Sequence, residues 1–262
     1  MCDPVVIDQR APMSSSVTQI GVQNNGISPQ DACQLALNLF MQNFPKLQEL
    51  AAETARQRSE EFCRETIRKL QSEGKNDFTA FSDPDVQYVL LNAQTDYARF
   101  GTTELLESLT TLISKRVQHD DEFILKVTID KALSIVNLMT SEQLDLLSLM
   151  FVCENVKFGH IDSLQTLQKN LELWADTFVS ANMRSMQYLT MLGWTILTIP
   201  NPVEILAKTY GFRKDEIDKI CPPSIKALAS DYGLSLAGVV LAIVNAEIKL
   251  RHHFDMRIWI HT

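Results

Sequence analysis

The sequence is poor in the patterns that mark secreted and membrane-spanning proteins. Its cysteines are five in number and include no C-x-x-C pair, which predicts reduced thiols in a cytosol rather than a disulfide framework. The start, Met1–Pro4, has neither the basic nor the apolar region of a signal peptide. No uncharged apolar run reaches the roughly 18 residues of a spanning helix. These absences predict a cytoplasmic chain.

Positive charge and catalytic motifs are scarce as well. A net charge of -8 gives no long-range attraction to phosphate backbones, so we expect no nucleic-acid partner. The chain contains none of the motifs G-x-S-x-G, H-E-x-x-H, G-x-x-x-x-G-K-[ST] or G-x-G-x-x-G. We therefore predict no cofactor and favour a non-enzymatic protein. A catalytic cysteine–histidine pair that assembles only in space stays open.

Helix signals dominate what is present. Ser28-Pro29, Ser82-Asp83-Pro84 and Thr140-Ser141-Glu142 each have the form of a helix start, and no βαβ alternation or internal repeat occurs. The prediction is an all-α multi-helix bundle over residues 28–262, with a possible subdivision near residue 200. Residues 1–27 form a flexible, amide-rich tail with too little apolar surface to fold alone. Pro45 should break or kink the first helix.

Apolar periodicity places the core in three helical stretches. They are Leu144–Val152, Met183–Ile199 and Leu236–Ile248. Short helices are expected between them, among them Pro223–Tyr232, and the alternation in Phe254–Ile260 predicts a short extended segment.

Two smaller inferences concern cysteines and a bilayer. Cys33, Cys63 and Cys153 fall on apolar helical faces, which favours core thiols. The apolar stretches Tyr188–Ile199 and Leu234–Ala246 are both shorter than the roughly 20 residues that span a bilayer, which favours buried helices.

The exception to the helical pattern is Val17–Ile27, where β-branched residues and amides alternate without charge or proline. Such a stretch can pair with another copy of itself, because stacked chains satisfy its backbone and its amides. The candidate self-assembly strand consists of Gln19, Ile20, Gly21, Val22, Gln23, Asn24 and Asn25. The alternative interpretation is a disordered leader that happens to be rich in amides.

Two resemblances bear on this interpretation. Gln19-Ile20-Gly21-Val22-Gln23-Asn24 resembles the core of the RIP homotypic interaction motif, Gln-[Ile/Val]-Gly-x-x-Asn, and related bacterial amyloid signalling motifs. Thr18 departs from the animal motif, which usually has Ile or Val there. The resemblance implies a homo-oligomer whose partner is itself or another protein with a similar motif.

The second resemblance covers most of the chain and is to an uncharacterised bacterial family, the LPO/Vpar family. It rests on the following stretches, in this order: Gly26-Ile27-Ser28, Leu39-Phe40, Asn43-Phe44, Phe81–Tyr88, Gly238–Ile243 and Phe254–Ile260. It implies a bacterial cytosolic protein and supplies no catalytic residue.

Histidines near residue 250 and beyond are the remaining candidates for a metal site. His252, His253 and His261 with Asp255 are of metal-ligand type, but adjacent helical histidines point about 100° apart and no i,i+4 pair accompanies them. We predict no bound metal. The sequence thus favours a helical adaptor or effector that assembles through its N-terminal strand, in bacterial conflict or stress signalling. A membrane-perturbing helical effector and an enzyme without a known motif are the alternatives.

Overall fold

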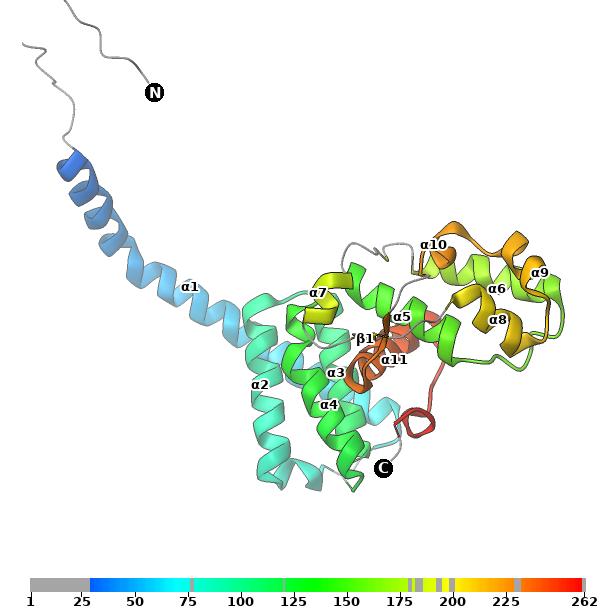
Figure 1. Ribbon diagram of the computed structural model, residues 1–262. Coiled ribbons are helices and arrows are strands. Elements are labelled where there is room, and N and C mark those ends of the chain that lie inside the picture. The colour runs from blue at the N-terminus through cyan, green and yellow to red at the C-terminus, as the bar shows by residue number, and fades with distance from the viewer. Residues whose placement is uncertain are drawn as a thin grey trace, which may run out of the picture. The chain divides into compact units, whose positions relative to one another are not determined.

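The protein is all-α, as predicted. The computed structural model describes residues 29–75, 78–119, 121–178, 181, 186–191, 195–197, 201–228 and 232–260 (Figure 1). In chain order the elements are α1 (Pro29–Ser72), η1 (Thr79–Ser82), α2 (Pro84–Phe100), α3 (Thr103–Gln118), α4 (Phe123–Ile135), η2 (Val136–Leu138), α5 (Ser141–Asn155), α6 (Leu164–Thr177), α7 (Met186–Met191), β1 (Thr195–Leu197), α8 (Pro202–Tyr210), α9 (Lys214–Ile220), α10 (Pro223–Lys226), β2 (Tyr232–Leu234), α11 (Leu236–Leu250) and η4 (Met256–Ile258).

Helix α1 runs without a break through Pro45, where the sequence predicted a break or kink. Proline removes one N–H and crowds the preceding turn, and the hydrogen bonds on both sides of it hold the helix together. The chain divides into two compact units, residues 1–51 and 52–262. In the first unit, Leu37, Met41 and Leu47 are exposed.

The core of the second unit is built around α5 and α11. Helix α5 begins with a capping box, in which the Gln143 amide donates to Thr140 Oγ1 and Gln143 Oε1 accepts from the Thr140 amide. Its apolar residues from Leu144 to Val152 are buried, as predicted. Helix α11 buries its residues from Gly238 to Ala246 and packs on α3, α4 and α5. Two of the three predicted core stretches are therefore confirmed.

A buried polar network joins α5 to α11. The Asn245 side-chain amide donates to Asp145 Oδ1 at 3.1 Å and to Ser148 Oγ at 2.8 Å. Lys249 Nζ lies 2.5 Å from Asp145 Oδ1, and Ser148 in turn donates to the Ala242 carbonyl oxygen. Because a buried carboxylate is costly without partners, this network fixes how the two helices are aligned.

Helices α2, α3 and α4 lie side by side, with an ion-pair network among them (Figure 1). Arg116 of α3 is almost fully buried, with its guanidinium 2.7 Å from Asp85 and 2.7 Å from Asp130. Lys126 also pairs with Asp85 at 2.7 Å. One arginine thus ties α3 to both neighbours.

The predicted helix Met183–Ile199 is wrong. Its described part consists of the short helix α7 and the strand β1, and Leu189 is its one buried hydrophobic residue among those described. Strand β1 pairs antiparallel with β2, with Thr195 opposite Leu234. In the predicted helix Pro223–Tyr232, the described residues form only the short helix α10 and, at Tyr232, the start of strand β2. Pairing between segments this far apart leaves no mark in the local periodicity.

Two further expectations need correction. Phe254–Ile260 is not extended but contains the 3₁₀ turn η4, because the Asp255 carboxylate accepts from the Arg257 amide and caps it. Cys33 and Cys63 are exposed rather than in the core, whereas Cys153 and Cys221 are buried. On this part of α1 the core-facing residues are Phe62, Thr66 and Leu70, whereas Cys63 and Ile67 are exposed. All four described cysteines are free thiols.

The length and hydrophobicity of the helices bear on whether any of them could span a membrane. Among the described residues, no helix is both long enough and apolar enough to cross a membrane.

Candidate functional site

The predicted self-assembly strand, Gln19–Asn25, lies outside the described residues, which begin at residue 29. His261, one of the histidines weighed as a metal ligand, lies outside them too. In the described part of the chain, no group of three or more His, Cys, Asp or Glu side chains is placed to hold a metal ion. The candidate site is therefore built from the clefts of the unit 52–262.

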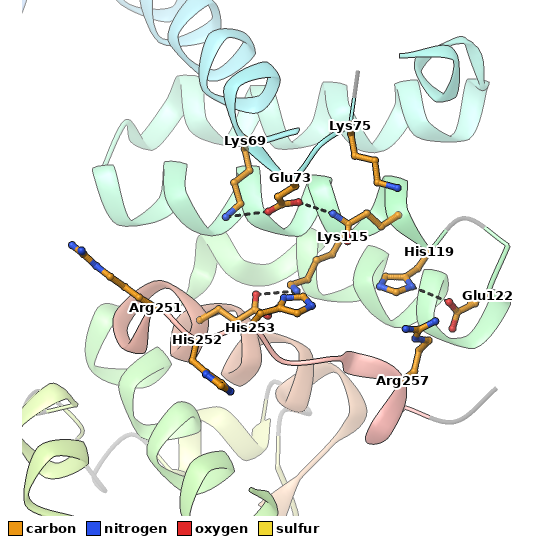
Figure 2. A pocket seen from close by; sticks show the side chains of 12 residues that line it. Lys69, Glu73, Lys75, Lys115, His119, Glu122, Arg251, His252, His253 and Arg257 are labelled. Carbon is orange, nitrogen blue, oxygen red and sulfur yellow. Dashed lines mark hydrogen bonds and ion pairs between the residues drawn. The ribbon is translucent and has the colours of Figure 1, made fainter. Parts of the chain in front are cut away.

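A polar cleft of about 660 Å³ opens where three helices end (Figure 2). Its walls come from the ends of α1, α3 and α11 and from the segment after α11. We call it the cationic cleft. Its lysines and arginines are Lys69, Lys75, Lys115, Arg251 and Arg257, its acids are Glu73, Glu122 and Glu247, and Gln118, His119, His252 and His253 complete it.

The charge of this cleft is opposite in sign to that of the chain. Five lysines and arginines face three glutamates, an excess of two positive charges before any histidine is protonated, whereas the whole chain carries -8. The carbonyl ends of helices carry about half a negative charge each, so three of them offset part of this excess. Some of the basic side chains therefore stabilise helix ends, as expected at that position.

Glu247 joins three of the walls of the cleft. Its carboxylate accepts from Lys115 Nζ of α3, with Oε2 at 2.8 Å and Oε1 at 3.0 Å. Oε1 also accepts from the Phe254 backbone amide at 2.8 Å and lies 3.1 Å from His253 Nδ1. Helix α3, helix α11 and the segment after α11 are thus held by one carboxylate.

The other two glutamates of the cleft are also engaged. Glu73 accepts from Gln118 Nε2 at 2.6 Å and from the Ser114 hydroxyl, and lies 3.3 Å from Lys69 Nζ. Glu122 lies 2.9 Å from His119 Nδ1. Every carboxylate that lines the cleft therefore has a donor from the protein itself.

Two basic side chains of the cleft differ from its glutamates, because they have no partner among the described residues. The side chains of Lys75 and Arg251 are exposed and make no hydrogen bond or ion pair with any described residue. Arg251 has φ 51° and ψ 39°, the left-handed conformation, and it ends α11. Glycine is the usual residue there because a side chain makes this conformation costly. The sharp turn at Arg251 sends the chain back along the cleft.

A second cleft, of about 430 Å³, adjoins the first. We call it the aromatic cleft, because Phe158, Phe254 and Trp259 line it together with His160, His252 and the segment Asn155–Lys157. The rings are in contact: the Phe158 centroid lies 5.8 Å from that of His252, and the His252 centroid lies 4.9 Å from that of Phe254. His252 and His253 line both clefts.

Strongly shifted titratable groups do not gather in these clefts. Burial raises the pKa of Glu154 to about 8, but Glu154 lines neither cleft. Burial also raises the pKa of the Cys153 thiol well above its usual range, which keeps it protonated and unreactive. The hydrogen bonds from Arg257 lower the pKa of Asp255 to about 2. This last shift comes from a simple ion pair at the edge of the aromatic cleft.

Comparison with known proteins identifies a family. One family model matches residues 26–230 of the chain. The chain belongs to this family. The matched span holds α1 to α10 and ends before β2 and α11, so the α11 wall of the cationic cleft falls outside it. No curated protein and no solved structure matches the chain.

Sequence reasoning singled out only part of this site. It weighed His252, His253 and Asp255 as metal ligands, and the structure instead places the histidines on the wall between two clefts. It missed Lys75, Lys115 and Glu247. The signal that was available is the gathering of basic residues at helix ends, but which ends meet depends on tertiary packing.

Proposed function

We propose that this member of the family is a non-enzymatic helical adaptor or effector. It assembles with itself, or with a protein carrying a similar motif, through Gln19, Ile20, Gly21, Val22, Gln23, Asn24 and Asn25. In this proposal the family is the bacterial LPO/Vpar family that the sequence resembles, and the chain acts in the cytosol in conflict or stress signalling.

The observation that carries the proposal is where the core begins. Among the described residues, the first buried side chain is that of Phe62, and every one described from Cys33 to Glu61 is exposed or only partly buried. The described residues before Phe62 therefore add almost nothing to the packed interior. In the proposal, the strand Gln19–Asn25 precedes this exposed part of the chain and acts in assembly rather than in the core.

The chemistry of the strand suits stacking. In parallel, in-register strands, ladders of side-chain amides would form along the stack at Gln19, Gln23, Asn24 and Asn25. Ile20 and Val22 would fill the dry contact between sheets, and Gly21 would permit close approach of the backbones. A charge at position 20 would then face the same charge in each neighbouring copy, which opposes assembly.

The position of the shifted carboxyl also favours a binding role over an enzyme. Catalytic sites gather groups with perturbed pKa values in one cleft. Here Glu154 lines neither cleft, and each glutamate of the cationic cleft is held by the protein's own donors.

The test compares four chains by sedimentation and electron microscopy over a range of concentrations. They are the full-length protein, residues 28–262, Ile20→Asp and Ser15→Ala. We expect filaments from the full-length and Ser15→Ala chains, and only dispersed protein from the other two. If all four stay monomeric, or if residues 28–262 assemble as well as the full chain, the strand has no assembly function.

A further inference from the structure

We propose that the cationic and aromatic clefts form one binding site for an anionic aromatic ligand, with nucleoside phosphates as the chemical class. The base would occupy the aromatic cleft and the phosphates the cationic cleft. This proposal goes beyond the assembly function and does not depend on the N-terminal strand.

The two clefts share a wall, so one ligand can contact both. His252 and His253 line both, and Figure 2 shows their rings pointing to different sides. The His252 ring packs against Phe254 and Phe158, whereas His253 lies 3.1 Å from the Glu247 carboxylate in the cationic cleft. One ligand that crosses this wall would therefore meet rings on one side and charges on the other.

The aromatic cleft suits a base. Small-molecule sites have volumes of roughly 300–1,000 Å³ and are lined by aromatic residues with a few polar groups. At about 430 Å³ the cleft falls in this range, and Phe158 and Trp259 are only half-buried on its wall. Every base has a flat π-face that stacks on such rings. The Trp259 Nε1–H already donates to the Asn155 carbonyl oxygen at 3.0 Å, which fixes the orientation of that ring.

The cationic cleft suits phosphates, because its acids are occupied and some of its cations are not. The three glutamates accept from Lys115, His119, Gln118 and other protein donors. Lys75 and Arg251 have no side-chain partner among the described residues. Lysine and arginine are the usual phosphate ligands, arginine because its planar group can donate two parallel hydrogen bonds.

Basic residues at helix ends also have a purely structural explanation, since they offset the negative ends of α1, α3 and α11. That explanation accounts for the charge but not for an adjoining aromatic cleft of ligand size. It also predicts that removing the charges lowers stability without affecting any ligand. Measuring ligand binding together with thermal stability therefore distinguishes the two explanations.

The experiment titrates the full-length chain with ATP, GTP, CTP and UTP by isothermal calorimetry. Inorganic triphosphate tests the cationic cleft alone, and adenosine tests the aromatic cleft alone. The variants are Lys75→Ala/Arg251→Ala in the cationic cleft and Phe158→Ala in the aromatic cleft. The matched control is Arg213→Ala/Lys214→Ala at α9, which removes the same charge from an exposed place outside both clefts. Thermal melts of each variant verify folding.

We expect at least one nucleotide to bind with a Kd in the micromolar range. The double variant Lys75→Ala/Arg251→Ala should weaken it roughly tenfold or more, and the control by less than about twofold. Phe158→Ala should weaken the nucleotide and leave inorganic triphosphate unchanged. The proposal is overturned if no nucleotide binds at about 1 mM, if the double variant binds as tightly as the control, or if inorganic triphosphate binds as tightly as the nucleotide.

Discussion

Glu154, near the end of α5, makes the stability of this protein depend on pH in an unusual direction. Burial raises the pKa of its carboxyl from an ordinary value of 4.5 to about 8. Its Oε1 atom is buried and accepts no hydrogen bond from any described residue. At neutral pH the folded protein therefore holds this proton, whereas the unfolded chain, with the ordinary pKa, has lost it.

The sign and size of the effect follow from this difference in bound protons. Between pH 4.5 and pH 8 the folded state binds one proton more, so the free energy of unfolding falls as pH rises, by about 1.4 kcal/mol per pH unit. Glu154→Gln carries no proton in either state and removes this slope. Because the side chain is only partly buried, we expect the variant to gain about 2–4 kcal/mol relative to wild type between pH 5 and pH 8.

The assay is urea unfolding of both chains at intervals from pH 5 to pH 9, followed by circular dichroism. Other groups also titrate over this range, so the informative quantity is the difference between variant and wild type at each pH. Glu172→Gln, on the exposed side of α6, is the control and should keep the wild-type slope. A difference for Glu154→Gln that stays constant from pH 5 to pH 9 would refute the reasoning.

Three further predictions concern the core and the metal. Leu147 is fully buried in α5, so Leu147→Asp should place an unpaired charge in the core and abolish soluble expression; a folded variant would show that α5 is peripheral. Asn245→Leu should lower the free energy of unfolding by about 1–3 kcal/mol, because Asp145 loses a donor, and chemical denaturation would measure this loss. Elemental analysis of the purified protein should find no stoichiometric transition metal, and one metal per chain that is lost on His252→Ala would contradict this.

Local signals predicted much of the fold. The Asp83-Pro84 start of α2 and the Thr140 start of α5 are in place, because capping depends only on neighbouring residues. Helix α5 is apolar on nearly every side, which marks a central helix wherever the rest of the chain lies.

The remainder depends on contacts between distant segments. Strand β1 forms because its partner comes more than thirty residues later, and periodicity cannot detect that pairing. Cys63 is exposed although the preceding Phe62 is buried, because which side of α1 is covered depends on the helices packed against it. The clefts draw Lys75, Lys115 and Glu247 from three separate helix ends, so no motif announces them.

The polar network between α5 and α11 limits how this protein can move. Moving Asn245 and Lys249 away from Asp145 would leave a buried carboxylate without these two donors. These contacts therefore oppose movement of α11 along its axis. The segment that follows it leaves through the left-handed turn at Arg251 and then lines both clefts. The network therefore stabilises α11, and the turn at Arg251 begins the part of the chain after α11 that lines the clefts.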